Sequence, residues 1–339
     1  MSLFEKPQKY HLVVNAESGV ALKKGCRVVA EMARQTLRDK VASLSIVQAG
    51  EVDSCLKKRF REASPNSVVL VCSGDGTLRT AAQLGYERNQ PFAIVPGGTY
   101  NITSRNLGLG KDILETFRMY DQGNNYFRPI DVSTANDKVF ISKLTFTSGF
   151  DVVPKLRQAK IDKNARAVFN AFNAICDVAR TSLNTPETYK YWRDDASDGP
   201  NEIHSLDRHI SFRSNCLLIA NDHLPRKISL RRFFSQPHDM QSGHLSVVGF
   251  RTKTALDVAK ILSGLVGGNW SEPDAVHYLR PKSLIVEMRD HNDQEFENLG
   301  PSMRASVDGE AIDFPGRCVT VTKHPDSLRI LVPECHSTL

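Results

Sequence analysis

The hydrophobic positions in the first third of the chain alternate between short apolar runs and stretches with the spacing of an amphipathic helix. Most of these runs are uninterrupted, which is typical of a buried strand, and segments 25–38, 52–61 and 112–120 carry the helical spacing. Strands that alternate with helices predict a parallel sheet with helices on both faces. The predicted strands are 12–14, 44–47, 68–72 and 93–96.

From about residue 138 the pattern changes, and most apolar segments become short runs bounded by turn residues. Many such strands predict an antiparallel sandwich. We therefore expect an α/β domain over residues 1–137 and a β-rich domain over residues 138–324, with an exposed loop at 187–207, where Asp, Gly, Pro and Asn accumulate. The predicted strands are 139–146, 209–219, 243–250, 283–288, 302–307 and 317–321, and the predicted helices are 163–182 and 254–265.

The strand 68–72 ends in the sequence S-G-D-G-T, residues 73–77, and helical spacing resumes directly after it. Two glycines allow a sharp turn, and the free N–H groups at a helix start favour an anion such as phosphate. Asp75 would repel a phosphate unless a cation or a donor hydroxyl lies between them. The stretch therefore predicts a phosphate site with a cation, with an ordinary Asp-Gly turn as the alternative.

A second turn of the same kind follows the strand 93–96, with the sequence P-G-G-T-Y-N at residues 96–101. Two consecutive parallel strands would bring both turns to the carboxyl edge of the sheet. Open α/β sheets bind their ligands at this edge. The pair of turns therefore favours a ligand site over two unrelated turns.

These motifs resemble those of the diacylglycerol kinase catalytic-domain family, the lipid kinases that include bacterial diacylglycerol kinases and sphingosine kinases. The family's G-G-D-G-T is S-G-D-G-T here, and its P-x-G-T-x-N is P-G-G-T-Y-N. Further matches stand in the family's order at 15–19, 130–132, 148–151 and 307–310. The resemblance implies a Rossmann-like nucleotide-binding domain of the NAD kinase and diacylglycerol kinase type, a β-sandwich lipid-substrate domain, and a C-terminal segment, about 325–339, that returns to the first domain.

The resemblance also implies ATP and Mg²⁺ as cofactors, with the nucleotide bound by the turns at the sheet edge. Gly97 and Gly98 could instead serve only the backbone conformation, and Asn101 could cap the helix that follows it. The implied nucleotide contacts are Asn15, Gly19, Ser73, Gly74, Asp75, Gly76, Thr77, Leu78, Arg79, Gly98, Thr99 and Asn101.

The motif D-G-E at residues 308–310 supplies the catalytic carboxylate in the family, so the resemblance places that role on Asp308 and Glu310. Asp75 is the candidate for a contact to magnesium or to a hydroxyl. Two carboxylates two residues apart could point to one side, where one accepts the proton of a lipid hydroxyl and the other holds Mg²⁺ or orients the first. The sequence leaves open which of the two is the base, and a plain hairpin turn is the alternative.

Besides Ser73 in the first turn, three positions depart from the family pattern. Ile102 stands where the family has Asp, and Gln48 stands where it has a nucleotide-contacting Thr. Many bacterial members hold a structural metal in an Asp-Gly loop, which here reads D-M-Q-S-G-H-L at 239–245. A hard cation prefers carboxylate oxygen, so Ser242 in place of Asp weakens the site implied for Asp239, Ser242 and His244.

Composition adds little that is specific. The net charge of +6 is compatible with an anionic ligand or a membrane surface, and the seven cysteines are scattered without a C-x-x-C pair, which favours reduced thiols in a cytoplasmic protein. The polar N-terminus and the absence of a run of about 20 apolar residues predict no signal or transmembrane segment, so a lipid substrate would be reached peripherally at a membrane surface. A basic and aromatic stretch at 226–234 could touch lipid headgroups or form a solvated strand. No feature predicts nucleic-acid binding, and a homodimer is possible.

Taken together, the sequence predicts an ATP- and Mg²⁺-dependent lipid kinase that transfers the γ-phosphoryl group to a lipid hydroxyl, with a diacylglycerol-like acceptor. A sphingoid base, a ceramide-like lipid and phosphatidylglycerol remain alternative acceptors, because acceptor choice depends on cavity shape. An NAD kinase, which shares the G-G-D-G turn, is a second enzyme hypothesis. A nucleotide- or lipid-binding protein without catalysis is the hypothesis from another class.

Overall fold

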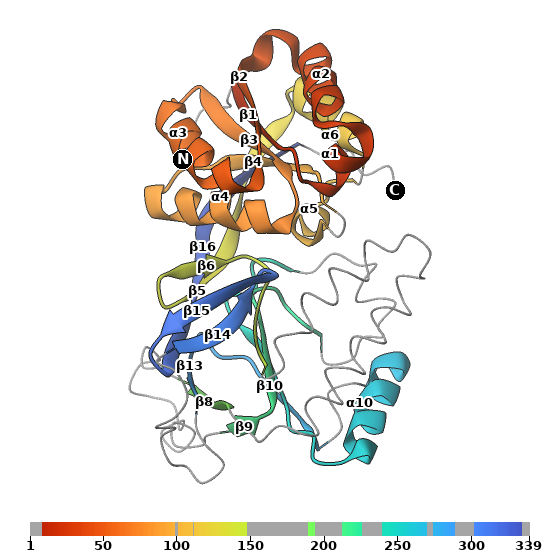
Figure 1. Cartoon of the computed structure of the whole chain (residues 1–339), viewed down its shortest axis with the longest axis vertical. Coiled ribbons are helices and arrows are strands. Elements are labelled where there is room, and N and C mark those ends of the chain that lie inside the picture. Colours follow the sequence, from red (N-terminus) through yellow and green to blue (C-terminus); the bar gives the residue numbers. More distant parts are fainter. Residues whose placement is uncertain are drawn as a thin grey trace.

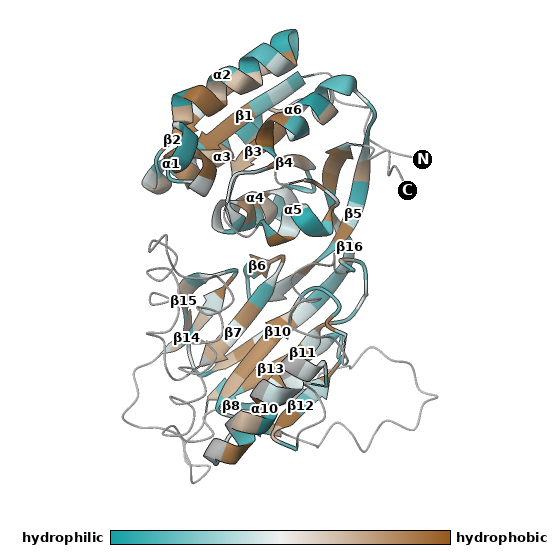
Figure 2. Cartoon of the chain, turned by 90° about the vertical axis from the view of Figure 1, so that its right-hand side faces the viewer, coloured by the Kyte–Doolittle hydropathy of each residue, from teal (hydrophilic) through white to brown (hydrophobic). Residues whose placement is uncertain are grey.

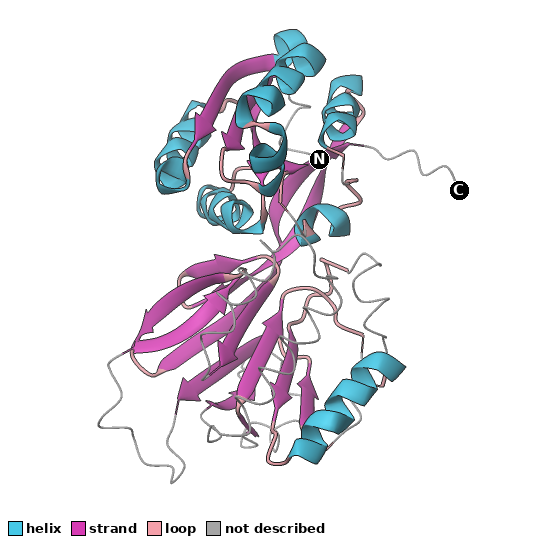
Figure 3. Cartoon of the chain, turned by 45° about the vertical axis from the view of Figure 1, so that its right-hand side comes forward, coloured by secondary structure: helices cyan, strands magenta, loops and turns pink. Residues whose placement is uncertain are grey.

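The computed structural model describes residues 9–98, 101–110, 112–147, 189–193, 212–225, 239–269, 274–288 and 302–333. Within these ranges the chain forms two lobes, an N-terminal lobe in which helices surround a sheet and a C-terminal lobe built mostly of strands (Figure 1). The division of helices and strands between the lobes is plain in Figure 3. The predicted helix at 163–182 lies outside the described residues.

The N-terminal lobe is organised around four parallel strands in the order β2-β1-β3-β4. All four predicted strands of this lobe are present. The central strands are buried along most of their length, whereas β2 lies at the open edge. The strands are β1 (Lys9–Asn15), β2 (Val41–Val47), β3 (Ser67–Ser73) and β4 (Phe92–Pro96).

Helices cover both faces of this sheet because successive strand residues point to opposite sides. Leu12 of β1 packs with α2 and α6 on one face, and Val13, the next residue, packs with α3 and α4 on the other. The side chain of Asp112 caps α6 by accepting from the N–H groups of Leu114 and Glu115. The helices are α1 (Gly19–Lys24), α2 (Cys26–Leu37), α3 (Val52–Glu62), α4 (Asp75–Arg88), α5 (Ile102–Asn106) and α6 (Ile113–Gln122), with two 3₁₀ turns, η1 (Arg38–Lys40) and η2 (Ala49–Glu51).

The C-terminal lobe is the predicted sandwich. Its described strands form a six-stranded sheet in the order β12-β11-β10-β7-β14-β15, which packs against β8, β13 and part of β16. Apolar side chains from both layers fill the space between them, and the brown strands in Figure 2 mark this core. The elements are β6 (Lys138–Phe140), β7 (Lys143–Thr147), β8 (Tyr189–Arg193), β9 (Phe212–Ser214), β10 (Cys216–Ala220), β11 (Ser246–Phe250), α10 (Ala255–Gly267), β12 (Val276–Leu279), β13 (Ser283–Met288), β14 (Ser302–Val307) and β15 (Glu310–Pro315).

Two long strands join the lobes. β16 (Cys318–Pro333) pairs with β13 in the C-terminal lobe and, further on, runs parallel to β4, where Ile330 faces Phe92. β5 (Asn125–Ala135) follows β16 antiparallel along most of its length, and Figure 1 shows the two strands crossing from one lobe to the other. The described strands of the N-terminal sheet and this layer of the sandwich are therefore one continuous sheet.

The single strand expected at 139–146 is divided into β6 and β7, which belong to different sheets. Two further expectations about elements were wrong. Segment 187–207 was expected to be a loop, but Tyr189–Arg193 is strand β8, with Tyr189 and Tyr191 buried in the sandwich core. The last strand was expected to end at residue 321, but β16 continues to Pro333. In both cases long-range pairing with β13, β5 and β4 supplies the strand's hydrogen bonds, which a local pattern does not reveal.

Candidate functional site

The first Gly-rich turn forms the start of helix α4. Ser73 ends β3, Gly74 is the N-cap, and the helix begins at Asp75. No side chain caps α4, as is also the case for α2, α3 and α5. Helix α4 follows a Gly-rich turn, and a helix start of this kind without a capping side chain favours an anionic ligand.

The second Gly-rich turn packs directly on the first. A Cβ built on Gly98 would lie 2.7 Å from the Cα of Gly74, and a Cβ on Gly97 would lie 2.9 Å from the Cα of Ser73. The N–H of Gly97 donates to the carbonyl of Ser73 at 3.0 Å. Glycine at 97 and 98 thus serves close backbone packing between the two turns, in keeping with the conformational role left open for it.

Asn101 closes the second turn rather than capping α5 through its side chain. Its backbone is in the left-handed region, with φ of 48°. The Oδ1 atom accepts from the N–H of Gly98 at 2.7 Å, and Nδ2 donates to the carbonyl of Gly98 at 3.0 Å. Asn101 stands at the N-cap position of α5 but makes no capping hydrogen bond there.

The loop after β1 joins the same edge. The side-chain amide of Asn15 donates to the hydroxyl of Thr77 at 2.9 Å. At Gly19 helix α1 begins, and the next N–H, that of Val20, donates to the carbonyl of Gly97 at 2.8 Å. Three loops that are distant in sequence therefore meet at the carboxyl ends of β1, β3 and β4.

Asp308 lies in the tight turn between β14 and β15, with φ of 49°. Its carboxylate is buried and accepts three backbone N–H groups, from Ile141 at 2.9 Å, Ser142 at 2.9 Å and Lys143 at 2.8 Å. Burial raises the pKa of this carboxyl to about 6, and the charge of Asp75 adds to the rise, while the three N–H donors oppose it. Asp308 thus fixes the connection between β6 and β7.

Glu310 opens strand β15 and reaches across to the first turn of α4. Its Oε2 atom accepts from Arg79 through Nη2 at 2.7 Å and Nε at 3.2 Å. Its Oε1 atom lies 2.7 Å from a Cβ built on Gly76, so a larger residue there would displace the carboxylate. The hairpin of the C-terminal lobe is in this way attached to the anion-binding end of α4.

The structure therefore brings together most of the residues predicted for the site, around the start of α4. Leu78 is buried beneath this turn, and its N–H donates to the carbonyl of Gly74 at 3.2 Å. Thr99 and the segments 148–151 and 226–234 lie outside the described residues. Arg79 was predicted as a nucleotide contact, and its pairing with Glu310 was missed because the partners are 231 positions apart.

Gln48, one of the three departures, has a local role. Its side chain accepts from the backbone N–H of Glu51 and the carboxylate of Glu51 accepts from the N–H of Gln48, which together form a capping box on the 3₁₀ turn η2. This hydrogen bonding stabilises the connection between β2 and α3.

The loop predicted to hold a structural metal satisfies its own polar atoms. The hydroxyl of Ser242 donates to the carbonyl of His244 at 2.9 Å, and Oδ1 of Asp239 accepts from the N–H of Gln241 at 2.9 Å. Among the described residues, no three His, Cys, Asp or Glu side chains are grouped as metal ligands would be. Ser242 thus contributes a hydroxyl that is already paired where the family has a carboxylate, and the metal site implied for this loop stays a prediction.

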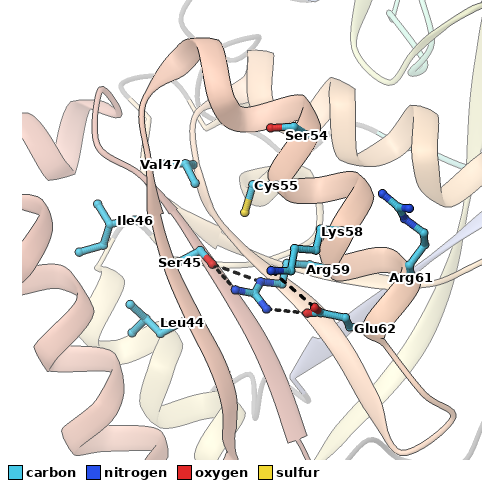
Figure 4. Close-up of a pocket in the computed structure, with 10 residues that line it drawn as sticks. All are labelled: Leu44, Ser45, Ile46, Val47, Ser54, Cys55, Lys58, Arg59, Arg61 and Glu62. Atoms are coloured by element: carbon cyan, nitrogen blue, oxygen red, sulfur yellow. Dashed lines mark hydrogen bonds and ion pairs between the residues drawn. The ribbon is translucent and has the colours of Figure 1, made fainter.

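A surface groove of about 930 Å³ lies between the edge strand β2 and helix α3 (Figure 4). The guanidinium of Arg59 crosses it and donates to Ser45 and to Glu62, so these polar groups already pair with one another. None of the predicted site residues lines this groove, so the groove is not part of the candidate functional site.

The fold and the site define a class of protein: a two-lobed α/β protein in which an uncapped helix start meets a carboxylate from a β-rich lobe. Residues 9–135 match the family model of the diacylglycerol kinase catalytic domain, which confirms the resemblance predicted from the motifs and supports a kinase.

Solved structures share the whole architecture. A candidate diacylglycerol kinase from Bacillus anthracis superposes with a TM-score of 0.65 at 16% identity, covering 97% of this chain and 98% of that one. A diacylglycerol kinase from the same organism gives a TM-score of 0.63 at 18% identity, with coverage of 97% and 98%. These likenesses confirm the predicted fold class. No curated protein sequence gives a significant match.

In the part of the chain that the structure describes, no helix combines the length and the apolar character needed to span a bilayer.

Proposed function

We propose that this protein is an ATP- and Mg²⁺-dependent lipid kinase that transfers the γ-phosphoryl group to the hydroxyl of a diacylglycerol-like acceptor. The observation that carries the proposal is the contact between Glu310 and the first turn of α4. A candidate base from one lobe thereby lies beside a phosphate-binding helix start in the other, which is the juxtaposition that phosphoryl transfer to a hydroxyl requires.

The nucleotide would bind at the edge where the loops meet. The uncapped N–H groups of α4 suit the phosphates, and Gly74 and Gly76 present no side chain that would hold an anion away from the backbone. Asn15 and Asn101 support this edge by bonding to Thr77 and Gly98. Gly19 and Thr99 remain proposed members of the nucleotide site, whereas the guanidinium of Arg79 pairs with Glu310.

The carboxylate of Asp75 is the proposed protein ligand for Mg²⁺. One or two carboxylates together with substrate phosphates are the usual ligands of this ion in kinases. A single carboxylate at the start of α4, that of Asp75, is therefore enough for such a site. When bound, the ion would neutralise charge on the phosphates during transfer. Without such a cation the carboxylate of Asp75 would repel the phosphates at the same helix start.

We assign the base to Glu310 rather than to Asp308. Both oxygens of Asp308 accept backbone N–H groups, so its lone pairs serve the turn that carries the hairpin. Glu310 uses Oε2 for Arg79, and Oε1 is directed toward Gly76. In the proposed reaction the lipid hydroxyl oxygen attacks the γ-phosphorus of ATP, and Oε1 of Glu310 accepts the proton of that hydroxyl. The bond between the γ-phosphorus and the bridging oxygen breaks, and ADP leaves.

Transfer of labelled γ-phosphate from ATP and Mg²⁺ tests the function directly. The acceptors are diacylglycerol, monoacylglycerol, sphingosine, ceramide and phosphatidylglycerol in detergent micelles, with NAD as the control. We expect label on a lipid with the wild-type protein and none above background with Glu310→Gln. Arg304→Gln, at an exposed ion pair with Asp313 in the same hairpin, is the matched control and should retain activity.

Each other outcome contradicts part of the proposal. Label on sphingosine, ceramide or phosphatidylglycerol alone would retain a lipid kinase and replace the acceptor. Label on NAD alone would make the protein an NAD kinase. No label on any acceptor, with ATP binding still measurable by titration calorimetry, would indicate a binding protein that has lost catalysis.

A further inference from the structure

Two apolar side chains are exposed at the corner where α1 meets α2. Leu22 is 71% exposed and Val28 is 49% exposed, although aliphatic side chains of this size are usually buried. Gly25, with φ of 92°, turns the chain between the two helices, so that Leu22 precedes the bend and Val28 follows it. Figure 1 shows α1 and α2 next to each other at one side of the N-terminal lobe.

Basic side chains surround these two apolar ones. Lys23, Lys24 and Arg27 are exposed, and none of them forms an ion pair within the part of the chain that the structure describes. Glu31 stands on α2 one turn after Arg27, and Asp112 at the start of α6 has its pKa lowered chiefly by the N–H groups that it caps and further by Lys24. The corner therefore carries an excess of positive charge.

Within the described residues, two exposed lysines of α3 are neutralised by acidic neighbours, unlike those of the corner. On α3, Lys57 pairs with Asp53 at 2.8 Å and Lys58 lies 4.0 Å from Glu62. Such i, i+4 pairs are typical of a solvated helix face. A surface with unpaired cations around exposed aliphatic side chains has instead the two features that attract proteins to anionic bilayers.

The corner is close to the proposed nucleotide site. Helix α1 begins at the edge where Val20 bonds to Gly97, and its six residues span about 9 Å at the usual rise. A flat surface that touched Leu22 and Val28 would therefore lie within a few helical turns of the phosphate-binding turns. This distance would suit an enzyme that takes its acceptor from the same surface.

We propose that the α1–α2 corner, formed by Leu22, Lys23, Lys24, Arg27 and Val28, docks this protein on an anionic lipid bilayer. The cations contact the headgroup phosphates, and the two aliphatic side chains enter the interface between headgroups and acyl chains. This docking rests on the proposed function, because a lipid kinase must reach its acceptor at a membrane. Binding to a bilayer can nevertheless be measured without any turnover.

Vesicle sedimentation tests the docking. The vesicles are phosphatidylcholine alone or phosphatidylcholine mixed with phosphatidylglycerol, at low and at physiological salt. The test variant is Lys23→Gln/Lys24→Gln/Arg27→Gln, and the matched control is Lys57→Gln/Lys58→Gln/Arg61→Gln on α3. Both variants lower the net charge of +6 by three, so they differ in the surface that is changed and not in total charge.

We expect the wild-type protein to bind the mixed vesicles and not phosphatidylcholine alone. Because each basic residue near an anionic surface contributes roughly fivefold in affinity, the corner variant should lose about a hundredfold. The α3 control should lose much less. Leu22→Ser/Val28→Ser should also weaken binding, whereas Leu256→Ser, at a 62% exposed leucine of α10, should not.

Three results would overturn the proposal: no binding of the wild-type protein to mixed vesicles, equal losses in the corner and α3 variants, or a dimer in solution that Leu22→Ser converts to a monomer. Kinase activity on micelles and on vesicles distinguishes a failure of the docking proposal from a failure of the proposed function. If docking is correct, the corner variants phosphorylate lipid in detergent micelles as the wild type does and lose activity on vesicles. A wild-type protein that labels micellar lipid but ignores vesicles would keep the function and refute the docking.

Discussion

Asp308 and Glu310 stand two residues apart in one hairpin, yet their carboxylates have different surroundings. The left-handed backbone at Asp308 turns its side chain inward to three N–H groups, and Glu310, the first residue of β15, extends toward α4. A local pattern could identify both acids as candidates. It could not separate them, because their roles depend on donors from residues 141–143 and on Arg79.

Arg79 acts in this scheme as a positioning residue for Glu310. We expect Arg79→Met to lower kcat by roughly ten- to a hundredfold, since a hydrogen bond to a charged group is worth about 1.5–3 kcal/mol, and to leave the KM for ATP largely unchanged. Arg79→Lys should recover part of the loss. Steady-state kinetics with the labelled lipid acceptor measure both constants.

A different split between kcat and KM would contradict this role. If Arg79→Met raised the KM for ATP and left kcat unchanged, the guanidinium would bind nucleotide, as its place in the sequence motif predicts. Guanidinium chloride added to the Arg79→Ala variant gives an independent readout, because it should restore turnover if the lost group held Glu310 in position.

The ionisation of Asp308 should make the free energy of unfolding depend on pH. Its pKa is about 6 in the folded protein and near 3.8 when unfolded, so between these values the folded protein holds a proton that the unfolded chain has lost. Raising the pH through this window therefore destabilises the wild type, by up to about 3 kcal/mol for a two-unit shift. Asp308→Asn cannot titrate and should lack this trend.

Urea unfolding of both proteins, without divalent cations, at several pH values across this window measures the difference in their free energies of unfolding. The free energy of unfolding of the wild type should fall relative to that of Asp308→Asn as the pH rises. Above about pH 6 the two free energies should change in parallel. Curves that stay parallel throughout would show that Asp308 ionises as an ordinary carboxyl. A constant offset between the proteins carries no weight, since it reflects the amide's hydrogen bonding.

At the scale of elements, the two Gly-rich turns depend on each other. A Cβ at position 98 would lie 2.7 Å from the Cα of Gly74 and 2.9 Å from Oδ1 of Asn101, and both neighbours are fixed by the turn. We expect Gly98→Ala to cost about 1–3 kcal/mol of stability and to weaken ATP binding, because the second turn must move away from the first. Urea unfolding and titration calorimetry measure the two effects.

Gly267→Ala is the matched control for this substitution. Gly267 lies in α10, and a Cβ there would meet no atom within 4 Å. Alanine in a helix should be neutral or stabilising by up to about 1 kcal/mol. If Gly98→Ala were as well tolerated as Gly267→Ala, the turns would not be packed as described.

The same scale shows what the sequence could predict. Strands β1 to β4 and the helices between them follow from local apolar spacing, because each is completed by neighbours close in the chain. β8 and the second half of β16 do not, because their partners are β13, β5 and β4, far away in sequence. The site follows this division: its turns were predicted from their motifs, whereas the Asn15–Thr77 and Arg79–Glu310 contacts required the fold.

At the scale of the whole molecule, a buried ion pair lies where β5 and β16 pass between the lobes. Nζ of Lys323 is 3.2 Å from Oδ2 of Asp131, and both side chains are essentially inaccessible to solvent. Asp131 also accepts the N–H groups of Gly243 and Asp326, and Lys323 donates to the backbone carbonyl and to Oδ1 of Asn221. Burial lowers the pKa of Lys323, and Asp131 opposes that shift.

This pair connects β5, β16 and the loops before β11 and after β10, so it couples the sandwich to the strands that enter the N-terminal lobe. Lys323→Met should destabilise the protein by about 3–5 kcal/mol, because it leaves the carboxylate of Asp131 buried without its cation. Lys138→Met is the control: its exposed pair with Asp137 is worth at most about 1 kcal/mol.

The double variant Asp131→Asn/Lys323→Met decides between loss of charge balance and loss of packing. If the uncompensated charge causes the damage, removing the second partner should recover much of the stability lost in Lys323→Met, since a neutral pair leaves no buried ion. Equilibrium unfolding in urea of the wild type, the single variants Asp131→Asn and Lys323→Met and the double variant measures four free energies, and the coupling between the two sites follows from the cycle. If the double variant were as unstable as the sum of the single ones, the two side chains would act independently, and the junction between the lobes would owe its rigidity to the β5–β16 ladder alone.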